Sequence, residues 1–428
     1  MKNSYLHVMP TPPMHRNRSF TNPGRMHFSQ AVAIIQSQVG IIKGVQVLYS
    51  DSAPLEADLV LSLPQDGIRL VFDPISQRLK IIDIVNMRLV KLKYCGMLFN
   101  TPEILPSIEQ IEHSFGATHP AIYDAERQTF VLNFRGLSFT FHVDSKLQSN
   151  ISHAGLTSLK FPNGLSPVVS QLSVYVGNKL SSASPPPLPF SCYQHLIFLE
   201  QAHILRDKNS TKGLRLHLFY EGVSRGTESK KNSLVTEIYF NATCQDVTTI
   251  LGAPSRVFYK AEDKMKIHSP NAHKRVTRRR SDFFFNYFSL GLDILFDAKS
   301  QKAKKFVLHT NYPGHYNFNM YHRCEFNLSL PASQIQTSNT DITETRCTTL
   351  QVSAYTKWDT ISEYLKPSER PVVLNRASST NTTNPFGSTF CYGYQDIIFE
   401  VMPNNHIASM TLYTQELTIG PDQVNDEV

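Results

Sequence analysis

Long apolar runs are missing from this 428-residue chain, and tryptophan occurs only once. A helix that spans a membrane needs about 18 or more consecutive apolar residues, and the longest candidate, 283–296, is interrupted by Asn286 and Asp293. The six cysteines lie far apart and form no CxxC pair, unlike the close spacing of a disulfide framework in a small secreted domain. We therefore expect neither a membrane-spanning helix nor a disulfide-stapled fold.

Motifs of common enzyme classes are also missing. The chain has no P-loop, GxGxxG, GxSxG or HExxH motif, each of which carries a specific chemistry. The best metal candidate is a histidine-rich segment, 309–326, with His309, His315, His322 and Cys324. Its spacing differs from that of a structural zinc site, and a loop packed on a sheet is the preferred interpretation. The sequence thus predicts a protein that is not an enzyme and has no cofactor or metal site.

The composition favours a folded protein rich in β-structure. Hydrophobic residues make up 41% of the chain and charged residues 18%, which excludes global disorder. Aromatic residues reach 11%, and these side chains prefer strands. The length predicts two or three domains. The first 27 residues contain no apolar signal core, so we expect a cytoplasmic protein that begins with an irregular arm.

A strand–turn–strand pattern recurs along the chain. The pattern occurs at 66–74 with 77–84, at 290–297 with 304–309, at 392–401 with 406–413, and more loosely at 135–143. Such alternation, broken by a polar turn, indicates β-hairpins with one buried face. Short amphipathic helices are predicted before these hairpins, at 29–38, 106–115, 244–251 and 357–365.

These helices and hairpins predict an α+β fold made of four divergent helix–strand–β-hairpin repeats. The sheets are expected to be mainly antiparallel, with the short helices packed on them. The alternative to divergent repeats is that such short helices and hairpins recur by chance in any α+β protein. The predicted organisation is an arm at 1–27, a first domain with repeats one and two at 28–176, a Pro-rich linker with inserted strands at 177–240, repeat three at 241–330, a polar linker at 331–349, repeat four at 350–413 and a tail at 414–428.

Most of the excess positive charge lies in one loop. The chain has a net charge of +7, and the loop within 260–282 is predicted to lie between two strands of repeat three. Its basic residues are Lys260, Lys264, Lys266, Lys274, Arg275, Arg278, Arg279 and Arg280. Concentrated charge of this kind attracts phosphate-rich partners, either a membrane phosphoinositide or RNA. A solvated loop without a specific partner is the alternative.

The number of charges limits what the basic loop can do alone. An anionic leaflet gives about 1 kcal/mol per basic residue, so engagement of half the loop corresponds to about 4 kcal/mol and a millimolar contact. We therefore expect an auxiliary membrane contact. Nucleic acid is the weaker alternative, because no aromatic residues are interleaved with the charges. The sequence RRRS at 278–281 also suggests a phosphorylation site at Ser281, where phosphate would reduce the local positive charge.

Several segments together resemble the phagosome assembly factor 1 family. They include SQAVAIIQ at 29–36, IEQIEHSFGATHPAIYD at 108–124, FFFNYFSLGLDILFDA at 283–298 and KKFVLHTNYPGHYNFNMYHRCEF at 304–326. The resemblance covers most of 29–413. It implies a non-enzymatic adaptor in autophagy that acts with a WD40 β-propeller protein, breast-carcinoma-amplified sequence 3. It also implies recruitment from the cytoplasm to the phagophore, with an indirect or auxiliary membrane contact and no small-molecule substrate.

Overall fold

The structure, a computed structural model, divides into two parts, which are described separately. They are an N-terminal unit, 1–188, and a C-terminal unit, 189–428. The residues that the structure describes are 6–7, 26–101, 103, 105–116, 121–142, 167–185, 197–222, 230–260, 281–330, 349–367, 369–375 and 386–414.

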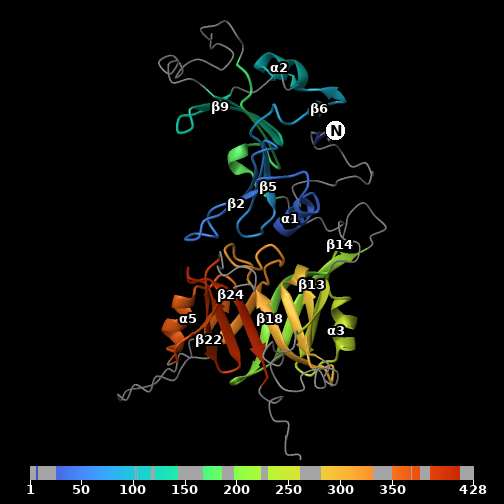
Figure 1. Cartoon of the computed structure of the whole chain (residues 1–428), viewed down its shortest axis with the longest axis vertical. Coiled ribbons are helices and arrows are strands. Elements are labelled where there is room, and N and C mark those ends of the chain that lie inside the picture. The colour runs from blue at the N-terminus through green and yellow to red at the C-terminus, as the bar shows by residue number, and fades with distance from the viewer. Residues whose placement is uncertain are drawn as a thin grey trace, which may run out of the picture. The chain divides into compact units, whose positions relative to one another are not determined.

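The N-terminal unit is built on an eight-stranded antiparallel sheet (Figure 1). Its strands run in the order β2-β3-β4-β5-β11-β10-β9-β8. Their bounds are β2 Gln46–Leu48, β3 Leu59–Leu63, β4 Ile68–Phe72, β5 Leu79–Ile84, β8 Ile122–Asp124, β9 Thr129–Phe134, β10 Leu137–His142 and β11 Gln171–Tyr175. Helix α1 (Phe28–Ser37) precedes β2, and α2 (Ile108–Phe115) precedes β8.

Two smaller features complete the N-terminal unit. A three-stranded sheet contains β1 (Leu6–His7), β6 (Leu92–Tyr94) and β7 (Met97–Leu98), so the range predicted as an irregular arm contributes one short strand. A 3-10 turn, η4, spans Leu180–Ser182.

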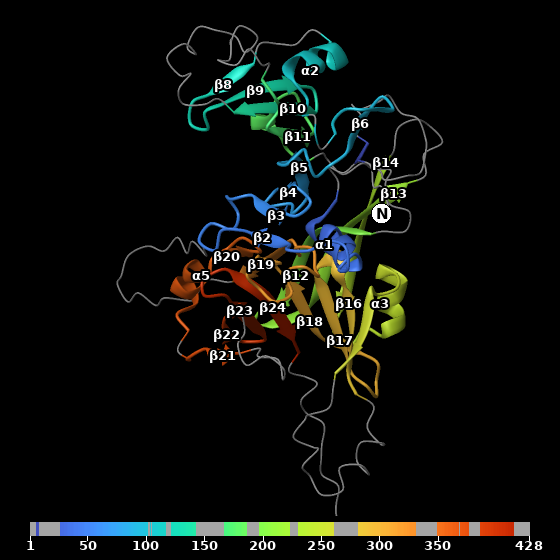
Figure 2. The same cartoon turned by 45° about the horizontal axis from the view of Figure 1, so that its top comes forward.

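The C-terminal unit contains a second eight-stranded sheet with the same internal order, β15-β16-β17-β18-β24-β23-β22-β21. Its strands can be followed in Figure 2. Their bounds are β15 Arg256–Tyr259, β16 Phe283–Tyr287, β17 Leu292–Phe296, β18 Ala303–His309, β21 Val372–Leu374, β22 Thr389–Tyr394, β23 Ile397–Val401 and β24 Ile407–Tyr413. Helices α3 (Cys244–Leu251) and α5 (Trp358–Leu365) precede β15 and β21, and η6 spans Phe288–Leu290.

A five-stranded sheet faces the second eight-stranded sheet. Its order is β14-β13-β12-β19-β20, with bounds β12 Phe198–Asp207, β13 Ser210–Gly222, β14 Lys230–Tyr239, β19 Phe326–Leu330 and β20 Leu350–Ser353. Leu216 from β13 and Ile294 and Phe306 from the larger sheet belong to one buried cluster. The insertion after repeat two therefore provides three strands of the second layer of a sandwich, and β19 and β20, which follow β18 in the chain, provide the other two.

Each eight-stranded sheet consists of two repeats joined through their fourth strands. Strands β5 and β11 pair antiparallel in the first sheet, and β18 and β24 pair antiparallel in the second. The first strand of every repeat lies at a sheet edge: β2, β8, β15 and β21. The predicted α+β fold of four helix–strand–hairpin repeats in mainly antiparallel sheets is confirmed.

The same main-chain contact closes all four repeats. The N-cap residue of each helix forms an isolated antiparallel bridge with a residue just before the fourth strand; the pairs are His27 with Arg78, Ser107 with Val168, Thr243 with Lys302, and Lys357 with His406. The first helical amide then donates to the preceding carbonyl, at 2.8–3.1 Å; the pairs are Phe28 with Gln77, Ile108 with Pro167, Cys244 with Gln301, and Trp358 with Asn405. Four equivalent closures favour a common repeat over chance recurrence of elements.

The predicted helices match the observed ones to within two residues. Gly116 and Gly252 have φ values of 85° and 77° at the C-caps of α2 and α3, where glycine avoids the strain of a left-handed residue. One predicted strand was wrong: 392–401 contains a turn, with Gln395 at φ 52°, that separates β22 from β23. Sequence alternation did not reveal this turn because its centre contains no glycine or proline.

Candidate functional site

A pocket of about 520 Å³ lies on the C-terminal unit. Its residues come from β15, β16, η6, β17, β18, β23 and β24 and from the segment that follows β18. Asp293 lies between Leu292 and Ile294, which belong to the core. Because neighbouring side chains in a strand point to opposite faces, the pocket lies on the sheet face opposite the core. The lining residues are Arg256, Phe258, Phe284, Asn286, Phe288, Asp293, Val307, His309, His315, Tyr316, Asn317, Met320, Tyr321, Glu400, Ser409 and Thr411.

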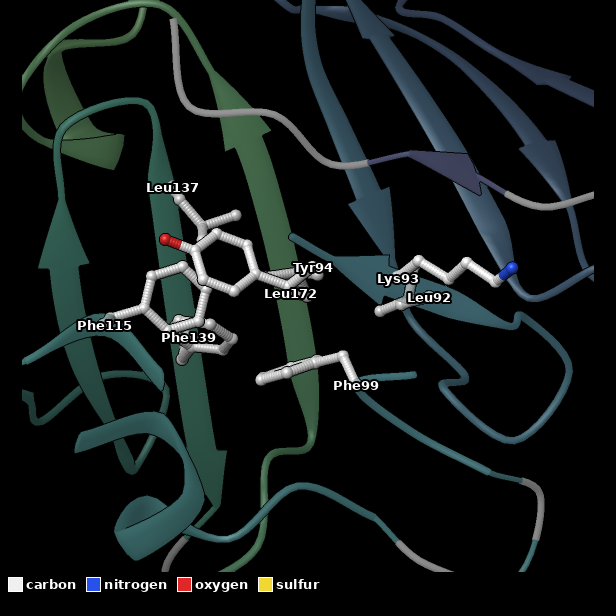
Figure 3. A pocket seen from close by; sticks show the side chains of 8 residues that line it. All are labelled: Leu92, Lys93, Tyr94, Phe99, Phe115, Leu137, Phe139 and Leu172. Carbon is white, nitrogen blue, oxygen red and sulfur yellow. The ribbon is translucent and has the colours of Figure 1, made fainter. Parts of the chain in front are cut away.

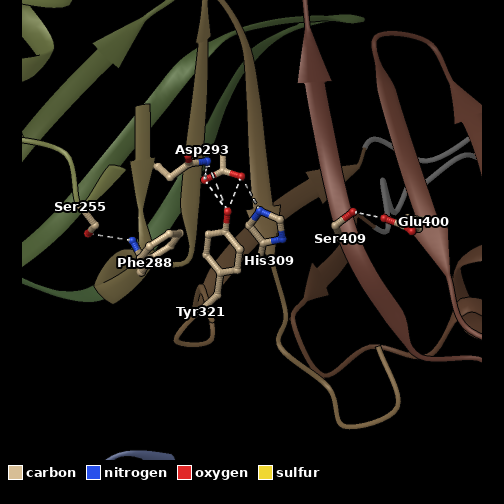
Figure 4. Close-up of polar contacts among 8 residues, drawn as sticks. Ser255, Phe288, Asp293, His309, Tyr321, Glu400 and Ser409 are labelled. Atoms are coloured by element: carbon tan, nitrogen blue, oxygen red, sulfur yellow. Dashed lines mark hydrogen bonds and ion pairs between the residues drawn. The ribbon is translucent and has the colours of Figure 1, made fainter. Parts of the chain in front are cut away.

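Asp293 is the centre of one polar cluster in this pocket (Figure 4). Its carboxylate accepts hydrogen bonds from Asn286 Nδ2 at 2.7 Å and from the Tyr321 hydroxyl at 2.8 and 3.0 Å. His309 Nε2 lies 2.9 Å from the same carboxylate, and its ring stacks on Tyr321 with centroids 3.9 Å apart. Burial and the neighbouring Asp293 raise the pKa of Tyr321, so its hydroxyl remains a proton donor.

Glu400 is the centre of a second cluster on β23, which is separated from β17 by β18 and β24. It accepts hydrogen bonds from the hydroxyls of Thr389 at 2.8 Å and Ser409 at 2.7 Å. His315 Nε2 lies 3.4 Å from the Glu400 carboxylate. Figure 4 shows Ser409 and Glu400 on neighbouring strands beside the Asp293 cluster. The pocket therefore contains two buried carboxylates, each held by neutral donors and an imidazole.

The histidine-rich segment packs on the sheet, as its sequence predicted. His309 and His315 contact different carboxylates, Asp293 and Glu400. Cys324 is buried, and burial raises the pKa of its thiol. Within the described ranges, no three histidine, cysteine or acidic residues are grouped as metal ligands would be.

The basic loop is anchored at the edge strand of the same sheet. The Lys260 amide donates to the Asp282 carbonyl at 2.8 Å, directly after the pairing of β15 with β16. Lys260 is exposed and Ser281 half-buried. The other predicted contact residues lie outside the described residues: Lys264, Lys266, Lys274, Arg275, Arg278, Arg279 and Arg280. The loop therefore begins and ends on two paired strands, and its role in anion binding stays a prediction.

A small apolar void lies in the core of the N-terminal unit (Figure 3). Its volume is about 10 Å³. It is lined by Leu92, Lys93, Tyr94, Phe99, Phe115, Leu137, Phe139 and Leu172. The rings of Tyr94 and Phe115 lie 4.3 Å apart between centroids. This void is a packing defect in a hydrophobic core rather than a site for a ligand.

Comparison with known proteins identifies the family. The sequence profile described as phagosome assembly factor 1 matches residues 24–413. The chain belongs to the phagosome assembly factor 1 family. A PHAF1 protein of Drosophila melanogaster is 62% identical over 392 residues, covering 91% of this chain and 89% of the relative. PHAF1 proteins of Arabidopsis thaliana and Caenorhabditis elegans are 36% and 35% identical, with the same coverage. No solved structure matches this chain.

The family resemblance drawn from the sequence is thus confirmed, but the pocket was not predicted. Asn286 and Asp293 were noticed only as polar interruptions of an apolar stretch. Such interruptions in strands with a buried face were the available signal, because buried polar groups require partners. No helix in the described part of this family member is long and apolar enough to cross a membrane.

Proposed function

We propose that this phagosome assembly factor 1 family member is a non-enzymatic adaptor in autophagy. Its sheet edges bind a WD40 β-propeller partner, breast-carcinoma-amplified sequence 3, and the complex acts at the phagophore. Family membership supports an assembly role. The structural observation that supports docking is the exposure of apolar side chains on the edge strands.

The four edge strands of the two eight-stranded sheets carry exposed apolar residues. Exposed fractions are 41% for Val47 on β2, 53% for Ile122 on β8, 43% for Val257 on β15 and 69% for Val372 on β21. An edge strand also has one row of main-chain groups without a neighbouring strand. Exposed backbone groups together with apolar side chains allow a partner strand to add to the sheet. The repeats thus provide four alternative docking edges.

The test is association of the purified full-length chain with the purified propeller protein. Four single variants, Val47→Lys, Ile122→Lys, Val257→Lys and Val372→Lys, each place a charge on one edge. We expect the variant at the docking edge to weaken association about tenfold or more, because burying an unpaired charge is costly. Isothermal titration calorimetry measures the change.

A matched control separates edge docking from a general effect of exposed charge. Leu89 is 52% exposed and lies in the segment between β5 and β6, so Leu89→Lys should leave association unchanged. Lack of association of the unaltered chain at micromolar concentration would reject the propeller partner. If all four edge variants bind the propeller protein as tightly as the unaltered chain does, the edges are not the docking surface.

Direct binding of an anionic membrane is a second candidate function. The observation in its favour is the anchoring of a loop with a charge of +6 over 260–280 on paired strands at Lys260 and Asp282. A clamped loop loses less conformational freedom when it binds than a free chain does. Membrane contact through this loop would reinforce recruitment by the propeller partner.

Charge reversal tests the loop. Replacing Lys274, Arg275, Arg278, Arg279 and Arg280 with Glu should abolish retention on vesicles that contain a phosphoinositide. The control replaces five exposed lysines elsewhere with Glu and changes the net charge equally: Lys208, Lys212, Lys299, Lys302 and Lys366. Equal retention of the loop variant and the unaltered chain would contradict this function. Retention on RNA instead of vesicles would assign the loop to nucleic acid.

A further inference from the structure

The pocket on the C-terminal unit has the dimensions of a ligand site. Its volume of about 520 Å³ lies within the range of roughly 300–1,000 Å³ that is common for small-molecule pockets. Aromatic rings form much of the wall: Phe258, Phe284, Phe288, Tyr316 and Tyr321. Such walls favour a ligand with an apolar body, and their faces carry negative electrostatic potential.

Charge in the pocket is distributed unevenly. The acidic groups Asp293 and Glu400 are buried, with exposed fractions of 7% and 6%. Arg256 is exposed, and its guanidinium lies 5.6 Å from the centroid of the Phe258 ring. It forms no ion pair with any residue in the described ranges. Because buried charges are screened less than exposed ones, the two carboxylates act more strongly on a ligand in the interior than Arg256 does at the exposed wall.

The charged acceptors of the pocket are the carboxylates of Asp293 and Glu400. Asp293 receives its hydrogen bonds from neutral side chains and from His309, and no lysine or arginine of the described chain pairs with it. In the tautomer that donates from Nε2 to Asp293, His309 Nδ1 is an acceptor. Figure 4 shows this nitrogen on the side of the ring away from Asp293. A donor-rich ligand is therefore complementary to the interior.

We propose that this pocket binds a small organic cation, an ammonium or guanidinium group carried on an apolar body. The cationic group donates to the acceptors around Asp293 and Glu400, and the body packs against the aromatic wall. A cation near aromatic faces gains additional electrostatic stabilisation. The site differs from both the sheet edges and the basic loop, which would recognise a protein strand and an anion.

Three probes of similar size test the selectivity of the pocket on the purified full-length chain. They are 4-phenylbutylamine, 4-phenylbutanol and 4-phenylbutanoate, which share a phenyl ring on a four-carbon chain and carry a cationic, a neutral and an anionic head group. We expect the amine to bind about tenfold or more tightly than the alcohol, since hydrogen bonds to a charged group contribute about 1.5–3 kcal/mol. The carboxylate should not bind. Calorimetric titration gives all three affinities.

Two variants assign the binding to this pocket. Asp293→Asn keeps the size of the side chain and removes its charge, so the amine should bind about tenfold more weakly. Arg256→Gln removes a repelling charge at the exposed wall, and the amine should bind about two- to fivefold more tightly. A gain of affinity cannot arise from misfolding, so this second variant decides the matter even if the first is unstable.

Asp83→Asn is the matched control, because Asp83 is a buried carboxylate on the other eight-stranded sheet. It should leave amine binding unchanged. Equal affinity for the amine and the alcohol, binding of the carboxylate, or amine affinity unaffected by both pocket variants would each overturn the proposal. A blocked pentapeptide with a central arginine then shows whether the cation can be a protein side chain or must be a free molecule.

Discussion

The two eight-stranded sheets use one position of the repeat in opposite ways. Arg69 and Asp293 are each the second residue of a third strand, β4 and β17. In the N-terminal unit, Arg69 pairs with Asp83 at 2.7 Å, and Ser173 donates to the same carboxylate at 2.7 Å. In the C-terminal unit, Asp293 faces Val307 across the strands and lines the pocket.

The difference shows how a duplicated scaffold can acquire a cavity. On the first sheet, the partly exposed Arg69 pairs with the buried carboxylate of Asp83, so this carboxylate already has a cationic partner within the chain. On the second, a carboxylate replaces the arginine, and the segment after β18 supplies Tyr321 as a donor beside His309 at the end of that strand. Aspartate is shorter than arginine and of opposite charge, so the substitution leaves both space and negative potential.

The largest expected effect is the loss of stability when a buried ion pair is removed, and this loss should differ between the two units. Arg206 and Asp396 are 6% and 5% exposed and lie 2.9 Å apart. Arg206→Met should destabilise the C-terminal unit by about 3–5 kcal/mol, because it leaves a buried charge without its partner. Asp83 is also buried, but the side chain of Arg69 is 41% exposed, so water screens this pair and can reach the carboxylate when the arginine is removed. Arg69→Met should therefore cost only about 1–2 kcal/mol in the N-terminal unit.

Hydrogen exchange followed separately in each unit measures both losses, since a single unfolding midpoint is not defined for two units. Equal losses in the two variants would show that burial does not determine the strength of these pairs.

A smaller effect is expected on acidification. His406 is buried, and burial, with Lys357 and Arg323, lowers its pKa to about 4. The unfolded chain, with a histidine pKa near 6.5, then binds more protons than the folded one. The C-terminal unit should therefore lose about 2 kcal/mol between pH 7 and pH 5.

Urea unfolding monitored by hydrogen exchange at pH 7 and pH 5 measures this loss of stability. In His406→Gln the loss should be smaller. The equivalent bridge position in repeat one is Arg78, which does not titrate in this range, so that repeat provides the control. The same loss of stability in His406→Gln as in the unaltered chain would mean that another group titrates.

The smallest effects concern helix caps. Thr243 and Asp246 form a reciprocal capping box at the start of α3, whereas Lys357 makes no side-chain cap for α5. Thr243→Ala should cost about 1 kcal/mol, and Lys357→Ser should add about 0.5–1 kcal/mol. Exchange protection of the two helices measures both changes. A loss of protection in Lys357→Ser would mean that the lysine stabilises α5 by another contact.

Local features could be predicted from the sequence, and features assembled from distant strands could not. The α3 helix over 244–251 was predicted because its apolar spacing and terminal glycine act within one segment. The pocket depends on Asn286, His309 and Glu400, which come from three strands. Their neighbourhood is set by sheet order, and the periodicity of a single sequence indicates hairpins of consecutive strands but not which distant strands pair.

The partial error at 392–401 has a similar cause. Gln395 adopts a left-handed conformation between β22 and β23, although glutamine is not a typical residue for such a turn. Asp396 stabilises the turn, because it accepts from the Thr211 amide and pairs with Arg206. A contact with another sheet thus overrides the local preference of the chain.

The closure between each N-cap residue and the start of the fourth strand determines where a repeat can accept inserted residues. Because this closure joins the helix directly to the last strand, the connections between the intervening strands can lengthen without breaking it. Residues 261–280 already form such an extension between β15 and β16. Protein engineers could therefore graft a foreign peptide or a fluorescent reporter between the first two strands of a repeat and keep its frame intact.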